Sequence, residues 1–81
     1  MSVEDIFETL RALVAEQFAR APEEVTMDTT FDDLDADSVD LVELVMAMEQ
    51  EFDIGETQET MLNSMKTVGD AVNYIASKVN K

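Results

Sequence analysis

The chain has 81 residues, with 19 acidic side chains against 5 basic ones, a formal charge of −14, and no His, Cys or Trp. Without His or Cys it offers no imidazole base, no thiolate nucleophile, no zinc site with nitrogen and sulfur ligands, and no disulfide. The negative charge disfavours nucleic acid and anionic lipid, which are polyanions, and favours basic proteins or metal ions as partners.

The first twenty residues predict an amphipathic helix. Ser2 and Asp5, three residues apart, form the pattern of a helix N-cap. We expect the helix to end within Ala19–Ala21, because Pro22 disfavours the helical conformation of the residue before it. The apolar residues fall at the three-and-four spacing of one helix face and comprise Val3, Ile6, Phe7, Leu10, Leu13, Val14 and Phe18.

A long connection follows, from about Arg20 to Asp37. Loops longer than about 12 to 15 residues are uncommon in compact domains unless they are functional or disordered. Scattered apolar residues argue against disorder here and predict that the connection packs on the core; they are Val25, Met27, Phe31 and Leu34.

A second helix is predicted between an acidic start at Asp37–Asp40 and a stop at Asp53–Gly55. Val42 and Met46 lie off its apolar stripe, which leaves two apolar side chains among the carboxylates of the exposed face. The stripe has helical spacing and comprises Leu41, Leu44, Val45, Met48 and Phe52.

Two further helices are predicted after residue 60. Met61, Leu62 and Met65 indicate a short one. Thr67 and Asp70 form a capping pair at the start of the last helix, and Lys78 and Lys81 lie at its end, where cations are favourable. The stripe of the last helix comprises Val68, Ala71, Val72, Ile75 and Val79.

The pattern predicts one all-α domain over residues 1–81, because no alternating run of β-branched residues indicates a strand. We expect a monomeric small four-helix bundle, with three longer helices, one short helix and a long loop between the first two. No basic leader is present and no stretch approaches 18 apolar residues, so we expect a cytoplasmic protein without membrane insertion.

The charge is confined to one part of the sequence. Residues 21–65 hold 14 acidic side chains and no basic one, whereas the other residues carry five of each sign. Such concentrated repulsion lowers stability, because the radius of a domain this small, roughly 12 Å, is close to the Debye length of about 8 Å. This cost indicates a function for the long loop and the second helix.

Calcium binding is one candidate function of the acidic loop. Asp33, Asp35 and Asp37 occupy positions one, three and five of an EF-hand loop. Position six should be Gly and is Ser38, and position twelve should be a bidentate Glu and is Leu44. We therefore expect no specific metal site, and an acidic adaptor domain that binds divalent ions stays open as an alternative.

Ser38 stands where the acidic loop enters the second helix. Asp and Ser are common N-caps, which accounts for Asp37 and Ser38 without any function. Catalysis by Ser38 is not expected, because the chain has no His to act as its base. A serine here suits the attachment of a phosphate by another enzyme, because free N–H groups and the helix dipole favour negative charge.

Residues 35–49, Asp-Ala-Asp-Ser-Val-Asp-Leu-Val-Glu-Leu-Val-Met-Ala-Met-Glu, closely resemble the acyl carrier proteins of dissociated (type II) fatty-acid synthesis. The resemblance covers the whole chain and implies a carrier rather than an enzyme, which shuttles acyl intermediates as thioesters on a 4′-phosphopantetheine arm. The other matching features are Phe31-x-x-Leu34, Glu49-x-x-Phe52-Asp53 and Thr67-Val-x-Asp-x-Val-x-Tyr-Ile75.

The resemblance also implies roles for individual residues. Ser38 would carry 4′-phosphopantetheine, transferred from coenzyme A by a separate enzyme with magnesium, and Asp37 would help to position the metal ion or substrate of that enzyme. The face presented to partner enzymes would comprise Val39, Asp40, Val42, Glu43, Met46 and Glu49. The pocket for the acyl chain would comprise Leu44, Val45, Met48, Phe52, Ile54, Leu62, Met65 and Ile75.

The implied partners are the phosphopantetheinyl transferase and acyltransferases, ketosynthases, reductases and dehydratases that dock through basic patches. The chain departs from the family pattern in three places. Asp35 replaces a common Gly, and Val39 replaces the usual Leu after the serine. The segment 55–58 lacks the common Ile-Pro entry to the short helix and is one residue longer than in the family. A specialised polyketide or aminoacyl carrier is therefore kept as an alternative.

Overall fold

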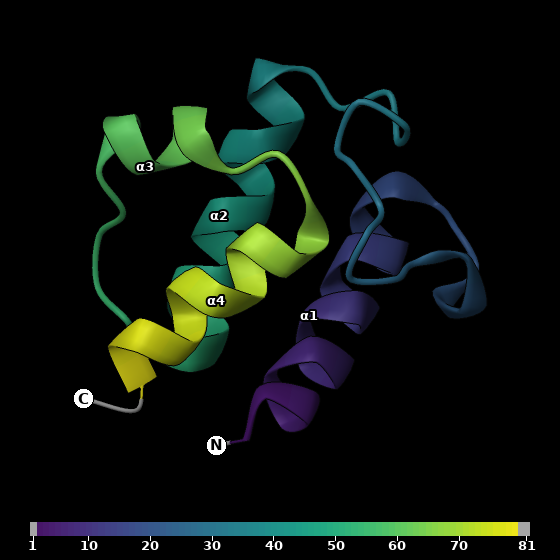
Figure 1. The fold of residues 1–81 in the computed structure, drawn as a ribbon. Coiled ribbons are helices and arrows are strands. Elements are labelled where there is room, and N and C mark those ends of the chain that lie inside the picture. Colours follow the sequence, from purple (N-terminus) through teal and green to yellow (C-terminus); the bar gives the residue numbers. More distant parts are fainter. Residues whose placement is uncertain (1, 80–81) are drawn as a thin grey trace.

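A computed structural model describes residues 2–79, which fold into four α helices. Figure 1 shows α1 and α4 lying alongside each other, with α2 behind α4 and α3 beside the upper end of α2. The predicted all-α bundle, with three longer helices, one short helix and a long first loop, is confirmed. The helices are α1 (Val3–Phe18), α2 (Ser38–Phe52), α3 (Glu59–Ser64) and α4 (Val68–Val79), and a 3₁₀ turn occupies Pro22–Glu24.

The start of α1 is the predicted cap, and its end is set by two consecutive residues. The Ser2 Oγ accepts the Asp5 N–H at 3.1 Å. After Phe18 the chain turns through Ala19, which has a left-handed φ of 54°, and the N–H groups of Ala19 and Arg20 both donate to the Ala15 carbonyl. These two bonds satisfy the Ala15 carbonyl, one of the carbonyls at the end of α1 that lack a partner further along the helix.

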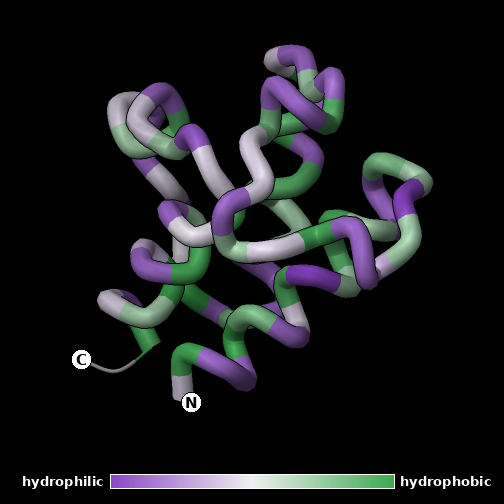
Figure 2. Tube along the Cα trace, turned by 45° about the vertical axis from the view of Figure 1, so that its right-hand side comes forward, coloured by the Kyte–Doolittle hydropathy of each residue, from purple (hydrophilic) through white to green (hydrophobic). Residues whose placement is uncertain are grey.

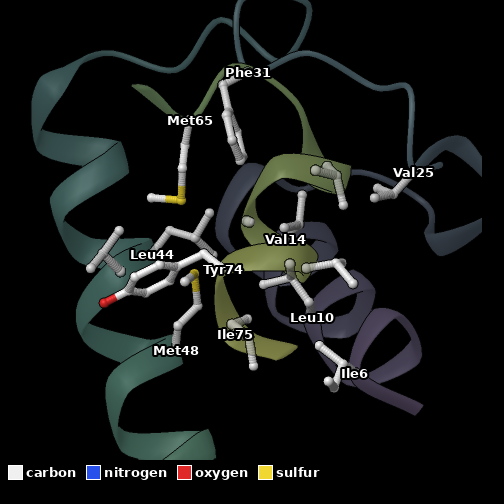
Figure 3. Packing of buried hydrophobic residues seen from close by; sticks show 14 of the residues in the cluster. Ile6, Leu10, Val14, Val25, Phe31, Leu44, Met48, Met65, Tyr74 and Ile75 are labelled. Carbon is white, nitrogen blue, oxygen red and sulfur yellow. The ribbon is translucent and has the colours of Figure 1, made fainter. Parts of the chain in front are cut away.

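The core lies where α1, α2 and α4 meet. Its most buried large side chains are Ile6, Leu10 and Val14 of α1, Leu44 and Met48 of α2, and Ile75 of α4 (Figure 3). Hydrophobic and hydrophilic segments alternate along the helices, as amphipathic helices require (Figure 2). Leu41, predicted on the core stripe, is only half-buried. Across residues 2–79, no helix has the length and apolarity needed to cross a membrane.

The long connection packs on the core, as predicted. Val25, Phe31 and Leu34 are buried and Met27 is half-buried. Backbone hydrogen bonds join the loop to the residues that begin α4, a feature that the sequence did not predict. They run from Phe31 N–H to the Lys66 carbonyl (3.0 Å), from Val68 N–H to the Thr29 carbonyl (2.9 Å) and from Gly69 N–H to the Met27 carbonyl (2.8 Å).

The start of α4 is the predicted reciprocal cap. Asp70 N–H donates to Thr67 Oγ1 at 3.1 Å, and the Asp70 carboxylate accepts the N–H groups of Lys66 at 2.9 Å and Thr67 at 3.1 Å. These backbone donors, that of Lys66 foremost, hold the pKa of Asp70 below its ordinary value.

Asp70→Asn is expected to lower the melting temperature at pH 7 by a few degrees, and by progressively less as the pH falls below the unfolded pKa of Asp70. The folded pKa of Asp70 is lower than the unfolded one, so its contribution is complete above the unfolded pKa and is lost as the pH falls through the folded pKa. Thermal melts of both proteins from pH 7 to pH 3 measure the difference between their melting temperatures. A difference in melting temperature that is as large at pH 3 as at pH 7 would contradict the lowered pKa of Asp70.

Candidate functional site

The first turn of α2 is held by two aspartates. Asp37 is the N-cap and its Oδ1 accepts the Asp40 N–H at 2.9 Å, while Asp40 Oδ2 accepts the Asp37 N–H at 3.2 Å. This reciprocal pair fixes the direction in which the loop joins the helix. Ser38 is the first helical residue, so the cap is supplied by Asp37 and not by the serine.

The Ser38 side chain is exposed, and its hydroxyl makes no hydrogen bond to any group of residues 2–79. The first N–H groups of α2 open towards the same end of the helix, because they have no acceptor one turn earlier. An accessible primary hydroxyl beside such donors fits a phosphate ester, as 4′-phosphopantetheine requires. Within residues 2–79 no carboxylate forms a hydrogen bond with the Ser38 hydroxyl, and those of Asp37 and Asp40 accept backbone N–H groups instead.

Asp35 explains one departure from the family pattern. Its φ of 58° lies in the left-handed region, which glycine occupies without strain and aspartate tolerates better than most residues. Arg20 approaches its carboxylate at 3.8 Å, but the Asp35 side chain is 92% exposed, so this ion pair contributes little stability.

Three apolar side chains follow one another along the exposed side of α2. Val39 is 64% exposed, Val42 is 46% exposed and Met46 is 55% exposed. Buried apolar contacts do not account for them, and spacings of three and four residues place them on one helix face. The structure therefore brings the predicted apolar members of the partner face together.

The predicted acidic members of that face have internal partners. Asp40 caps its own helix, Glu43 Oε2 accepts the Gln17 side-chain N–H at 2.8 Å from α1, and Glu49 Oε2 accepts the Thr57 N–H at 2.5 Å. Sequence reasoning missed both Gln17 and Thr57, because neither lies near its partner in the chain. The carboxylates are therefore oriented before any partner binds.

The predicted acyl-pocket residues lie in one apolar cluster. Ile54 and Leu62 are half-buried at its edge. Two hollows flank Leu62, one of about 250 Å³ bordered by Phe31 and Met65, and one of about 190 Å³ bordered by Val45. Both are below the range of about 300–1,000 Å³ typical of ligand sites, so a bound chain requires some opening. The buried members are Leu44, Val45, Met48, Phe52, Met65 and Ile75.

The acidic loop and α2 gather many carboxylates without a metal-binding arrangement. Within the part of the chain that the structure describes, no three acidic side chains converge as a metal ion would require. Asp37, which would be the third ligand of an EF-hand loop, is committed to capping α2.

Comparison with known proteins gives consistent matches along the chain. The family model described as a phosphopantetheine attachment site matches residues 8–75. Acyl carrier proteins of Streptococcus pyogenes serotypes M3 and M1 are each 44% identical over 73 residues, which make up 90% of this chain and 95% of each relative.

Two solved structures have the same fold. The acyl carrier protein from Enterococcus faecalis superposes with a TM-score of 0.80 at 32% identity, covering 96% of this chain and 99% of that chain. The acyl carrier protein from Thermotoga maritima superposes with a TM-score of 0.82 at 24% identity, covering 99% of this chain and 93% of that chain. The second likeness concerns the fold alone.

Proposed function

The chain belongs to the acyl carrier proteins, the family with a phosphopantetheine attachment site, and on this premise we propose that Ser38 bears the 4′-phosphopantetheine. The observation that carries the proposal is the exposed hydroxyl of Ser38, the first residue of α2, which makes no hydrogen bond to any other group of residues 2–79. The protein is a carrier of acyl groups and the chemistry on those groups is done by other enzymes.

Each part of α2 has a separate task in this proposal. The 4′-phosphopantetheine supplies a flexible arm with a terminal thiol, on which acyl groups are held as thioesters. Ser38 provides the attachment oxygen, and the Asp37–Asp40 pair holds that oxygen at a defined helix start. Asp37 also helps to position the metal ion or substrate of the transferase, because its exposed side chain directly precedes Ser38.

The proposed partners are enzymes of fatty-acid synthesis and the transferase that modifies Ser38. The names of the relatives and the acidic stretch 21–65 support this choice. Acyltransferases, ketosynthases, reductases and dehydratases would present basic patches to Asp40, Glu43 and Glu49, and apolar contacts to the exposed residues of α2. We further propose that the protein acts as a monomer in the cytoplasm.

Binding of a ketosynthase is expected to weaken steeply as salt rises. Between about 50 mM and about 500 mM NaCl, salt screens the attraction between the acidic face and a basic partner. The association rate constant should therefore fall at least about tenfold. Stopped-flow fluorescence measures it. Val42→Ala should instead raise the dissociation rate and leave the salt dependence unchanged. An affinity independent of salt would contradict electrostatic docking.

Intact mass spectrometry tests the attachment itself. Incubation with coenzyme A, magnesium and a phosphopantetheinyl transferase should add the mass of one 4′-phosphopantetheine. The tryptic peptide 21–66 holds both Ser38 and Ser64, so fragment ions must place the group on Ser38. No mass gain, or a gain located on Ser64, would overturn the proposal.

A further inference from the structure

Asp35 lies on a tight turn shortly before the attachment residue. Its N–H donates to the Asp32 carbonyl at 3.0 Å, and the Ala36 N–H donates to the Phe31 carbonyl at 3.1 Å. Together with the left-handed φ of Asp35, 58°, these bonds form the pattern of a Schellman turn. Phe31 is buried, so the turn is anchored to the core. The backbone of Asp35 therefore has a fixed position three residues before Ser38.

Arg20 brings a positive charge to the same place. Its N–H donates to the Ala15 carbonyl at 2.9 Å, which fixes its backbone at the end of α1. Its Nη2 lies 3.8 Å from Asp35 Oδ2. Residues 21–65 contain no basic side chain, so Arg20 is the last cation before the acidic stretch of the sequence. The two opposite charges thus meet within three residues of Ser38.

Stability does not account for the carboxylate of Asp35. Its side chain is 92% exposed and that of Arg20 is 36% exposed, and ion pairs between exposed side chains contribute little. A left-handed φ costs an aspartate more than a glycine, so Asp35 lowers the stability of the turn. It also adds a negative charge to a stretch that already repels itself. A carboxylate that is present despite both costs indicates a role in binding.

An enzyme that modifies Ser38 also covers Asp35. Three residues span at most about 11 Å, whereas a specific interface buries about 800 Å² on each partner. The transferase proposed for Ser38 therefore comes close to both Asp35 and Arg20. The two side chains act on its basic patch in opposite directions, because Asp35 attracts the patch and Arg20 repels it.

We propose that Asp35 is a docking carboxylate for the phosphopantetheinyl transferase and that Arg20 neutralises it until the transferase binds. The inference rests on the proposed function, in which Ser38 is the attachment site. Arg20 is the specificity-determining residue of the pair. A transferase with a cation opposite Asp35 displaces the guanidinium, whereas an enzyme without such a cation meets a neutral pair and gains no attraction from it.

Stopped-flow binding of the unmodified protein to the transferase tests the role of Arg20. Arg20→Gln removes the charge and should raise the association rate constant about two- to threefold at about 50 mM NaCl, and much less at about 500 mM. Lys78→Gln is the matched control, because it removes one positive charge near the end of α4, which Figure 1 shows far from the start of α2. An equal rise in both variants would reflect net charge alone and would overturn the role of Arg20.

Asp35→Asn tests the docking carboxylate in the same experiment. Asparagine tolerates a left-handed φ as aspartate does, so the turn should persist. The association rate constant should fall about two- to threefold, because one attractive charge is lost. Glu51→Gln is the matched control, since the rise of 1.5 Å per residue places this exposed acid about 20 Å from Ser38 along α2, beyond the Debye length. Equal slowing in both variants would overturn the role of Asp35.

The pairing of the two side chains is tested by combining the changes. Arg20→Gln should strengthen binding less in the Asp35→Asn background than in the parent, because no ion pair then has to break when the transferase binds. Titration of the unmodified proteins with the transferase measures the four dissociation constants. Equal strengthening in both backgrounds would show that Arg20 does not neutralise Asp35, and would overturn the proposal.

Modification kinetics separate this inference from the proposed function. With coenzyme A and magnesium present, Arg20→Gln should lower KM and leave kcat unchanged, because the pair acts on binding and not on the reacting atoms. If the parent protein gains no 4′-phosphopantetheine on Ser38, the proposed function fails, and the association rate constants still decide the role of Arg20. If the parent is modified and Arg20→Gln has the same KM as Lys78→Gln, only the roles given to Arg20 and Asp35 fail.

Discussion

Ser38→Ala is expected to abolish attachment of 4′-phosphopantetheine while leaving the fold intact. The substitution removes the only atom to which the group is proposed to bind. The Ser38 hydroxyl makes no hydrogen bond within residues 2–79, and Asp37 supplies the cap of α2. The free energy of unfolding should therefore change by less than about 0.5 kcal/mol, as for other exposed positions. Intact mass and a thermal melt measure the two effects.

Two controls separate chemistry from general accessibility. Ser64→Ala and Ser77→Ala remove hydroxyls that donate to the carbonyls of Met61 and Tyr74, at 2.8 Å and 2.7 Å, and both variants should be modified normally. Modification that survives in Ser38→Ala would contradict the assignment. It would indicate that one of these two serines, or Ser2, carries the group instead.

Asp37→Asn distinguishes the two roles given to Asp37. An asparagine oxygen can still accept the Asp40 N–H, so the helix start should persist. Loss of the negative charge should slow the transferase if Asp37 positions its metal ion or substrate. If Asp37→Asn is modified at the parent rate, Asp37 acts as a helix cap and does not position the metal ion or substrate of the transferase.

The sequence predicts the starts of the helices because caps are local. Ser2, Asp37 and the Thr67–Asp70 pair each bond to a group three residues away, so their pattern is visible in a short window. Ser38, the proposed attachment site, is predicted in the same way, from its position at a helix start and from the resemblance of residues 35–49 to a known motif. The ends of the first two helices were also predicted closely, but the left-handed conformations of Ala19 and Asp53 at those ends were not, because such conformations usually indicate Gly.

The contacts that the sequence did not predict join distant segments. The loop is tied to α4 through backbone groups, which every residue carries, so no residue type indicates the pairing of Thr29 with Val68. Thr57 is eight residues from Glu49 and seventeen from Tyr74, and its amide bond likewise has no signature. One signal was present: a Gly inside a helical stretch, such as Gly69, indicates a close approach of another backbone.

Gly69→Ala is expected to destabilise the fold, although the same change in most helices stabilises it. Alanine gains roughly 0.5–1 kcal/mol over glycine in a helix interior, which is an upper bound for Gly69 because it is the second residue of α4. At this position the new Cβ would lie 2.9 Å from the Met27 carbonyl oxygen, a backbone atom that already accepts the Gly69 N–H at 2.8 Å. Such overpacking costs about 1–3 kcal/mol, which exceeds the gain.

A thermal melt measures the net change in the stability of Gly69→Ala. Each kcal/mol lowers the melting temperature of a domain this size by about 4–8 °C. Asn73→Ala, on the exposed side of α4, is the matched control and should be neutral or slightly stabilising. A Gly69→Ala protein as stable as the parent would mean that the loop yields easily and that its bonds to α4 matter little.

The Gly69 variant also separates the stability of the loop from the chemistry at Ser38. The clash lies at Met27, near the middle of the loop, whereas Ser38 is held at the end of the loop by the Asp37–Asp40 pair. Below its melting temperature, Gly69→Ala should therefore be modified at close to the parent rate, with faster amide exchange limited to residues 27–31 and 66–69. A large loss of modification in the folded variant would show that the hydrogen bonds between the loop and α4 also set the orientation of Ser38, the proposed attachment site.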